Sequence, residues 1–293
     1  YQAVIYSFVP DVARGVAAVL AEPALAGALV DASVPLSSGP CTDWAGALKA
    51  SFEPGRTRFA GHYPQACGEQ SWAVADPQPA SYNARLLEAL WRDMGGRLTG
   101  RVRDGLAPAD KPSFELRSPP LADVVRDINK FSNNVMAQQL FLTLALARDP
   151  GQPATPQAAR AELRRWLTGK LGELPADTVL DNGSGLSRES RLSALQLARL
   201  LAQAYDSALM PELMASLPVS GIDGTMRRAR ASPGRAHLKT GSLRDVVGRA
   251  GYVLSDSGRR YVLVAIIQHA NANAARPALE ALVQWATRDA PAR

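Results

Sequence analysis

The sequence has 293 residues, of which 46% are hydrophobic and 20% are charged, and its formal net charge is +6. This is the composition of an ordinary globular protein, with ample apolar material for one large domain or two smaller ones. The positive charge comes mainly from arginines that are scattered along the chain rather than gathered in basic runs. The scatter disfavours nucleic-acid binding and indicates a mildly basic, solvated surface. Attraction to an anionic wall polymer or membrane surface is a secondary expectation.

The sequence also disfavours a membrane-spanning protein. Its strongly apolar stretch at residues 262–267 is far too short to cross a bilayer and fits a buried strand instead. The chain has no start methionine, and no charged segment followed by an apolar one marks a secretory leader. Together with a missing motif described below, this leads us to expect a mature or truncated product.

The first 80 residues are rich in Pro, Gly, Ser and Ala and contain short β-like pieces such as residues 57–61, which predicts an irregular or β-rich module. Cys41 and Cys67 lie there in Pro/Gly-rich loops. Two interpretations are open for them: buried free thiols, or a disulfide, which requires an oxidising compartment. The loop context favours the disulfide. His62 is the only other nearby ligand candidate, too few for zinc, so we expect no metal site.

Helical patterns begin after this module, and we place a domain boundary between residues 80 and 81. Apolar spacing predicts a helix over residues 84–91, ended by a glycine pair, with a short strand at 97–102. The strongest helical pattern covers residues 121–147 and is interrupted by a Ser-Asn-Asn triplet at 132–134. Because Ser and Asn favour helix caps over helix interiors, the triplet predicts a junction between two helices, with side chains turned into a cleft.

Two further helices are expected over residues 158–171 and 192–205, with a glycine-punctuated loop between them at 181–188. Taken alone, this loop is equally well a turn followed by a helix N-cap.

The end of the chain predicts three strands, at residues 238–242, 251–254 and 261–268, with a turn at 255–258. The last strand is almost wholly apolar, which is typical of a central position covered on both faces. A helix over residues 274–288 follows. Its sheet-facing side is expected to carry four apolar side chains: Leu279, Leu282, Val283 and Trp285.

Lys239, Thr240 and Gly241 lie on the first of these strands. Lys239 can present a fixed positive charge and Thr240 a hydroxyl, while Gly241 lets a ligand backbone approach closely. An extended peptide can pair with such a strand edge as an added strand. The simpler interpretation is an ordinary exposed lysine on a strand.

Ser132 and Asn134 lie on the same side of the predicted helix junction. A serine there can relay a proton, and the asparagine amide can both donate to and accept from a substrate amide. Considered alone, the triplet favours simple helix capping over a catalytic role.

The two motifs accompany a third, Ser-x-x-Lys, in penicillin-interacting serine enzymes, where that serine is the nucleophile. No lysine of the sequence follows a serine by three positions. The sequence therefore indicates the kind of site while omitting the residue that begins its chemistry.

The order of these segments resembles the serine D-alanyl-D-alanine carboxypeptidases/endopeptidases of the penicillin-binding protein 4 type, class C, peptidase family S13. The resemblance runs from about Tyr82 to Trp285 and includes the segments at 118–121 and 219–226. It implies an α+β fold with a penicillin-binding, transpeptidase-like domain, an antiparallel sheet flanked by helices, over residues 81–293. Residues 1–80 resemble the remainder of a β-rich module that this family inserts before its Ser-x-Asn motif.

The resemblance also implies roles for individual residues. Ser132 would pass a proton to the leaving group, Asn134 would hold the substrate amide, and Lys239 would supply positive potential. Thr240 would bind the terminal carboxylate beside Gly241, and the backbone N–H of Ser242 would form half of an oxyanion hole. Leu186 and Arg188 would border the pocket for the substrate side chain. The nucleophile, its lysine base and the second oxyanion N–H would lie upstream of Tyr1.

Two functions follow as expectations. The first is a periplasmic serine peptidase, without cofactor, that acts on peptidoglycan peptides and is acylated by β-lactams, its nucleophile segment missing from this chain. The second is a binding module that holds wall peptides without turnover. The DNA immediately upstream discriminates them, since only the first requires an in-frame Ser-x-x-Lys. A β-lactamase is a weaker third interpretation, because the inserted module and the 182–188 loop resemble carboxypeptidases.

Overall fold

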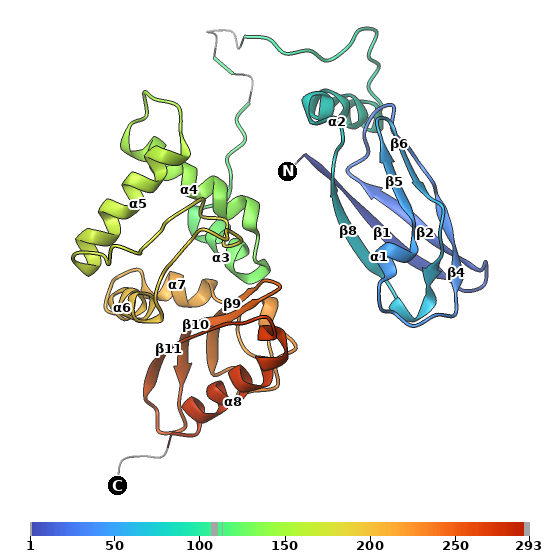
Figure 1. The fold of residues 1–293 in the computed structure, drawn as a ribbon. Helices are drawn as coiled ribbons and strands as arrows, with labels where there is room; N and C mark the ends of the chain where they lie inside the picture. Colours follow the sequence, from blue (N-terminus) through green and yellow to red (C-terminus); the bar gives the residue numbers. More distant parts are fainter. Residues whose placement is uncertain (1, 107–110, 113, 290–293) are drawn as a thin grey trace. The chain divides into compact units, whose positions relative to one another are not determined.

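The computed structural model describes residues 2–106, 111–112 and 114–289. The chain forms two compact units, Tyr1–Ser113 and Phe114–Arg293 (Figure 1). Helix α2 (Pro79–Asp93) belongs to the first unit, so the division into compact units falls later in the chain than the domain boundary expected between residues 80 and 81. The buried Tyr82 of α2 donates a hydrogen bond from Oη to the carbonyl oxygen of Ala3, at 2.8 Å. The change to helical periodicity marks the start of a helix that packs within the first unit.

The first unit is β-rich, as its composition predicts. A five-stranded sheet has the order β7-β4-β2-β1-β8, and a three-stranded sheet has the order β3-β6-β5. Phe8, Phe59 and Tyr63 belong to one buried core that takes side chains from both sheets. The elements before α2 are β1 (Ala3–Asp11), β2 (Val16–Glu22), β3 (Leu29–Val30), β4 (Ser33–Ser37), α1 (Trp44–Ala47), β5 (Ala50–Glu53), β6 (Arg56–Phe59), β7 (Tyr63–Pro64), η1 (Gln65–Cys67) and β8 (Gln70–Ala75).

Cys41 and Cys67 form a disulfide, with their Cα atoms 4.9 Å apart. This confirms the interpretation that their loop context favours. The bond joins the loop before α1 to the short helix η1, and Tyr63 Oη donates to the carbonyl oxygen of the neighbouring Gly68 at 2.8 Å. The cross-link therefore holds two irregular segments that have few ladder hydrogen bonds of their own.

The short strand expected at residues 97–102 is wrong. These residues have no regular secondary structure, and Arg97 instead accepts a hydrogen bond on its carbonyl oxygen from Trp91 Nε1 at 3.1 Å. An extended segment becomes a strand only when a neighbouring edge satisfies its backbone groups, and no strand of the described residues pairs with this one.

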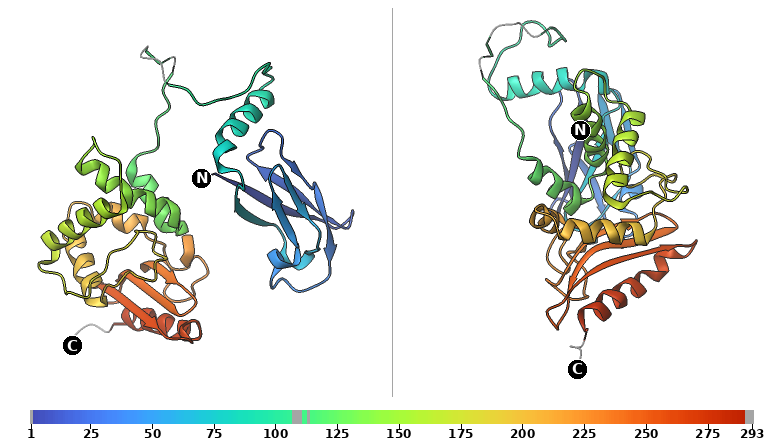
Figure 2. Two further views of the ribbon diagram at one scale, coloured as in Figure 1. Left: turned by 45° about the horizontal axis from the view of Figure 1, so that its top comes forward. Right: turned by 90° about the vertical axis from the view of Figure 1, so that its left-hand side faces the viewer.

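The second unit consists of a helical group, an antiparallel sheet and a final helix. The sheet has the order β11-β10-β9, and α6 covers one of its faces while α8 covers the other (Figure 2). The expected junction within residues 121–147 and the expected antiparallel strands are thus present. The elements are α3 (Leu121–Phe131), α4 (Asn134–Arg148), α5 (Pro156–Leu171), α6 (Ala194–Tyr205), α7 (Met210–Ser216), η2 (Gly224–Met226), β9 (Ala236–Ser242), β10 (Val246–Leu254), β11 (Arg260–Gln268), η3 (Ala272–Ala275) and α8 (Arg276–Thr287).

The core between the sheet and α8 explains the pattern of the last helix. Leu238 of β9, Leu263 of β11 and Val283 of α8 are buried together. Leu279 is buried as well, against Val247 of β10. The expectation for Trp285 is wrong: its side chain is 75% exposed.

Strand β11 is covered on both faces, as its apolar sequence predicts, but its expected central position is wrong. Among the described residues β11 pairs only with β10 and is an edge of the sheet. A strand that helices cover on both faces must be apolar whether it has one neighbouring strand or two. The apolar sequence therefore predicts the covered faces of β11 but not how many strands pair with it.

In the part of the chain that the structure describes, no helix combines the length and the apolar character needed to cross a membrane.

Candidate active site

The site begins at the junction between α3 and α4. Ser132 ends α3 in the left-handed conformation, with φ of 52°, and its N–H donates to the carbonyl oxygen of Ile128. Asn133 caps α4, its side chain accepting a hydrogen bond from the N–H of Met136 at 3.1 Å. A serine with positive φ is disfavoured by a free chain and is commonly held so at functional sites. The junction turns the Ser132 side chain toward the sheet.

Lys239 of β9 reaches that serine. Its Nζ donates hydrogen bonds to Ser132 Oγ and, at 3.1 Å, to the carbonyl oxygen of Thr240. Burial lowers the pKa of Lys239 below the ordinary lysine value, because desolvation disfavours the charged form. The two motifs, 107 residues apart in sequence, therefore converge through one charge-assisted contact.

Strand β9 presents an open edge at this point. The N–H of Leu238 donates to the carbonyl oxygen of Pro218 at 2.9 Å, on the side away from β10. Because strand N–H groups alternate in direction, those of Thr240 and Ser242 point to the same side. Among the described residues no backbone group bonds to either. A Cβ added to Gly241 would have no atom within 4 Å, so the edge is open to a ligand there.

The glycine-punctuated loop lies against the other side of the junction. Asn134 Nδ2 donates to the carbonyl oxygen of Ser184 at 2.6 Å. Gly183 has φ of 69°, and a Cβ there would approach Phe141 Cβ to 2.4 Å. Only glycine fits this close packing on α4. The loop is thereby fixed next to Ser132 and Asn134.

Leu186 and Arg188 complete the group of expected site residues. Leu186 is 49% exposed, and Arg188 forms an ion pair with Asp245 in the turn between β9 and β10. The hydrogen bond from Arg188 lowers the pKa of Asp245. The ion pair links Arg188, and with it this end of the loop, to the turn that follows β9.

Sequence reasoning did not identify the Lys130–Asp223 pair. Lys130 Nζ donates to Asp223 Oδ2 at 2.6 Å and to the carbonyl oxygen of Leu217 at 2.7 Å. Burial alone would raise the pKa of Asp223, but bonds from Lys130 and from the backbone N–H of Val219 lower it below the ordinary value. The pair fixes the last turn of α3, two residues before Ser132, to the segment that flanks β9.

A glycine beside that pair was the available sequence signal. Gly224 has φ of 53°, and a Cβ there would lie 2.6 Å from the carbonyl oxygen of Lys130. The pair Asp223-Gly224, within the segment 219–226, indicates that the backbone of this segment passes close to another part of the chain, here the end of α3. The next residue, Thr225, is hydrogen-bonded through its hydroxyl to Thr240 Oγ1 at 2.8 Å.

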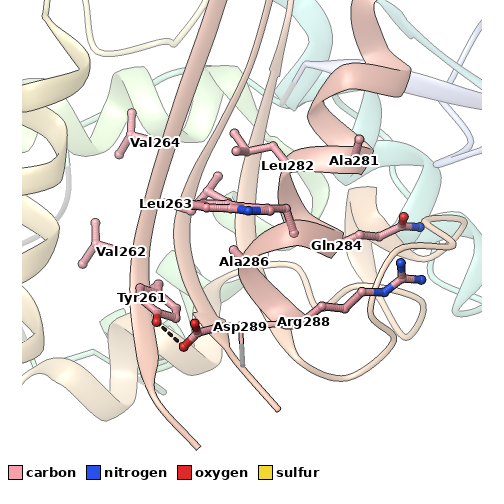
Figure 3. Close-up of a pocket in the computed structure, with 11 residues that line it drawn as sticks. Tyr261, Val262, Leu263, Val264, Ala281, Leu282, Gln284, Ala286, Arg288 and Asp289 are labelled. Atoms are coloured by element: carbon pink, nitrogen blue, oxygen red, sulfur yellow. Dashed lines mark hydrogen bonds between the residues drawn. The ribbon is translucent and has the colours of Figure 1, made fainter. Parts of the chain in front are cut away.

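Another pocket in the described part of the unit lies away from this convergence. A cavity of about 600 Å³ lies between β11 and α8, lined by mainly apolar side chains such as Leu263 and Leu282 (Figure 3). It contains none of the residues of the two motifs. Within the described ranges, no group of His, Cys, Asp and Glu side chains is arranged to hold a metal ion.

A known protein family matches most of this chain. Residues 8–289 match the model of the D-Ala-D-Ala carboxypeptidase 3 (S13) family. The chain belongs to this family. Its S13 relatives include the D-alanyl-D-alanine carboxypeptidase of Actinomadura sp. strain R39, 31% identical over 193 residues, 62% of this chain and 35% of that protein. The carboxypeptidase DacB of Haemophilus influenzae is 28% identical over 196 residues, 64% of this chain and 40% of that protein.

Solved structures of the S13 family have the same fold. Penicillin-binding protein 4 of Haemophilus influenzae aligns with a TM-score of 0.64 and 20% identity, over 97% of this chain and 66% of that one. Its complex with a β-lactam aligns with a TM-score of 0.59 and 20% identity, over 91% and 63%. The expected α+β fold of the penicillin-binding protein 4 type is confirmed. The aligned part of this chain corresponds to 35–40% of the length of the two curated relatives.

Proposed function

We propose that this chain supplies the proton-handling and substrate-holding part of a serine D-Ala-D-Ala carboxypeptidase/endopeptidase that acts on peptidoglycan stem peptides and is acylated by β-lactams. The observation that carries the proposal is the contact of Lys239 Nζ with Ser132 Oγ beside the open edge of β9. A half-buried lysine against a serine hydroxyl is suited to moving a proton and to stabilising charge that develops at that oxygen.

Each side chain has a role that matches its position. A substrate peptide adds to the free edge of β9 as an extended strand, and Gly241 allows its backbone to approach. The N–H of Ser242 donates to the developing oxyanion, and Ser132 returns a proton to the leaving nitrogen. Asn134, held by Ser184, binds the substrate amide. Thr240 binds the terminal carboxylate.

The neighbouring loop has a substrate-binding role in the proposal. Leu186 and Arg188 border the pocket for the substrate side chain, because the loop is fixed to α4 at one end and to Asp245 at the other.

The nucleophile comes from a Ser-x-x-Lys segment outside residues 1–293. No lysine of the sequence follows a serine by three positions, and the relatives named above are much longer than the region they share with this chain. The nucleophilic serine attacks the carbonyl carbon, the C–N bond breaks, and the leaving amine takes its proton through Ser132. Residues 1–80 are, in this proposal, the remainder of an inserted module.

The proposed location is the periplasm. A disulfide between Cys41 and Cys67 persists in an oxidising compartment, and peptidoglycan, the proposed substrate, lies outside the cytoplasm. The net charge of +6 favours peripheral association with anionic wall polymer or membrane surface.

The second candidate is a binding module that holds wall peptides without turnover. The absence of Ser-x-x-Lys from the sequence favours it, because the edge of β9 can bind a peptide without any nucleophile.

Labelling with a fluorescent penicillin, read on a gel, tests the proposal. The chain 1–293 is expected to remain unlabelled, and the protein extended by its upstream coding sequence is expected to become labelled. Lys239→Ala in the extended protein slows labelling, whereas Lys170→Ala, on the exposed side of α5, does not. Strong labelling of the chain 1–293 overturns the assignment of the nucleophile. An extended protein that stays unlabelled supports the binding module.

A further inference from the structure

Helix α2 of the first unit (Figure 1) carries an apolar stripe that the described residues leave exposed. The stripe consists of Leu87, Leu90, Trp91 and, directly after the helix, Met94. These positions follow the i, i+3, i+4, i+7 spacing of a single helix face. The exposed fraction of the side chains runs from 46% for Leu90 to 75% for Met94. A contiguous apolar patch of this kind marks an interaction surface.

The opposite face of α2 fixes the helix in place. Tyr82 is buried in the core of the first unit, and Leu86 packs against that core. Arg85 forms an ion pair with Asp76, the residue after β8, and both side chains are largely buried. The helix could turn its stripe inward only by breaking these contacts. The exposed apolar face is therefore a fixed feature of the unit.

Positive charge lies beside the stripe. The chain folds back after the helix, so that Trp91 Nε1 donates to the carbonyl oxygen of Arg97 at 3.1 Å. A Cβ added to Gly96 would lie only 2.4 Å from the same Nε1, which shows how closely the backbone follows the indole ring. The exposed Arg97 is thus held next to Trp91. Residues 94–103 contain two further exposed arginines, Arg101 and Arg103, and no acidic residue.

This charge distinguishes between possible partners. A second copy of the chain, related by a two-fold axis through the stripe, would bring the same arginines against each other. An anionic lipid surface satisfies both features, because its headgroups attract arginine and the layer beneath them takes up apolar side chains, tryptophan among them. Glu88 is already paired with Arg92, so within residues 79–103 only Asp93 opposes this attraction.

We propose that the apolar stripe and Arg97, Arg101 and Arg103 form a membrane-docking surface, with α2 lying in the plane of a bilayer that contains anionic phospholipids. This inference rests on the peripheral association in the proposed function and deepens it by assigning that association to one surface. From residue 87 to residue 94 the stripe extends about 10 Å along the helix axis. Insertion is accordingly shallow and binding reversible.

Co-sedimentation of the chain 1–293 with vesicles tests the surface. The chain is expected to bind vesicles of phosphatidylglycerol and phosphatidylcholine more tightly than vesicles of phosphatidylcholine alone. Leu90→Gln should weaken binding to the mixed vesicles about tenfold, through lost apolar burial. Arg97→Gln should weaken it about fivefold, through lost attraction to the headgroups. Leu195→Gln and Arg199→Gln, at exposed positions of α6, are the matched controls and should change nothing.

Quenching of tryptophan fluorescence by lipids brominated on their acyl chains locates the inserted residue. The sequence has five tryptophans, so the wild-type signal is compared with that of Trp91→Phe. Phenylalanine keeps an apolar ring at this position, and the variant is expected to remain bound while most of the quenching is lost. Quenching that persists in bound Trp91→Phe would place another part of the chain in the bilayer and overturn the proposal.

Two further outcomes also overturn it. Binding that Arg97→Gln weakens and Leu90→Gln leaves unchanged belongs to a surface for soluble polyanions, such as wall polymer, rather than for a bilayer. A chain that binds neither kind of vesicle, and whose dimer dissociates in Leu90→Gln on analytical ultracentrifugation, uses the stripe to bind a second copy.

Penicillin labelling of the extended protein is read separately from vesicle binding. Labelling without vesicle binding removes only the docking surface. Vesicle binding without labelling removes only the peptidase activity.

Discussion

The two edges of the sheet in the second unit differ in what lies along them. The edge of β9 is covered by residues 218–220 at its start and is open from Lys239 to Ser242, where Ser132 and the loop at 181–188 gather. Among the described residues no strand pairs with the outer edge of β11, which is mostly apolar and lies beside a largely apolar cavity. Both edges offer free backbone groups. At β9 the side chains of Ser132 and Lys239 meet beside the open edge, whereas β11 carries its charged and hydroxyl side chains, Arg260 and Tyr261, at one end. This difference separates the proposed catalytic edge from the other edge.

The largest expected effect is on the rate of penicillin acylation when Ser132 or Lys239, which meet beside the β9 edge, is removed. In the extended protein, Ser132→Ala and Lys239→Ala are each expected to slow penicillin acylation by about 10²–10³-fold, the usual loss for one preorganised electrostatic group. Because the two groups act through one contact, the double variant should be hardly slower than the slower single variant. Stopped-flow measurement of acylation rates checks this. Independent, multiplying losses would contradict the shared role.

Substitutions near the β11 edge are expected to change only the free energy of unfolding. Leu263→Ala should destabilise the second unit by about 2–5 kcal/mol, because its side chain is buried against α8. Trp285→Ala should change stability by no more than about 0.5 kcal/mol, since that side chain is 75% exposed. Urea unfolding followed through the NMR signals of the second unit measures both. A large loss in Trp285→Ala would show that the exposed ring is stabilising.

His237, at the covered start of β9, is expected to make the free energy of unfolding depend on pH, and this effect is smaller. Burial lowers the pKa of His237 below its ordinary value of 6.5, and its Nδ1 lies 3.1 Å from the carbonyl oxygen of Met214. Between the lowered pKa and about 6.5 the unfolded chain binds more protons than the folded one. The free energy of unfolding of the second unit should therefore fall as the pH drops below about 6.5.

His237→Asn should reduce this pH dependence, while His269→Asn, an exposed histidine in the same unit, should leave it unchanged. Urea unfolding at several pH values between 7.5 and 5 keeps Asp223 outside its titration range, because its pKa is lowered from 3.8. A pH dependence that survives in His237→Asn would assign the effect to another group.

Much of the second unit could be predicted from local patterns. The helix junction at 132–134 follows from the capping preferences of Ser and Asn, and the last three strands follow from their apolar runs. Convergence of Ser132 with Lys239 could not be derived from spacing, because their separation of 107 residues leaves many topologies open. The family resemblance supplied that expectation.

The failures share a physical cause. The neighbours of β11, the exposure of Trp285 and the missing strand at 97–102 all depend on which segments pair or pack in space, and periodicity reports only what kind of face a residue occupies. Lys130 was missed for the same reason: a single lysine near a helix end looks solvated until Asp223, 93 residues later, is found beside it.

The open edge of β11 has a further consequence, in the exchange of amide hydrogens with solvent. The N–H of Leu238 points away from β10, which fixes the direction of every amide across the sheet through the two registers. It follows that Leu263, Ala265 and Ile267 donate toward β10, whereas Val262, Val264 and Ile266 point to the free edge. In the chain 1–293, exchange along β11 should therefore alternate, slow and fast, residue by residue, while β10 between its two neighbours is protected throughout.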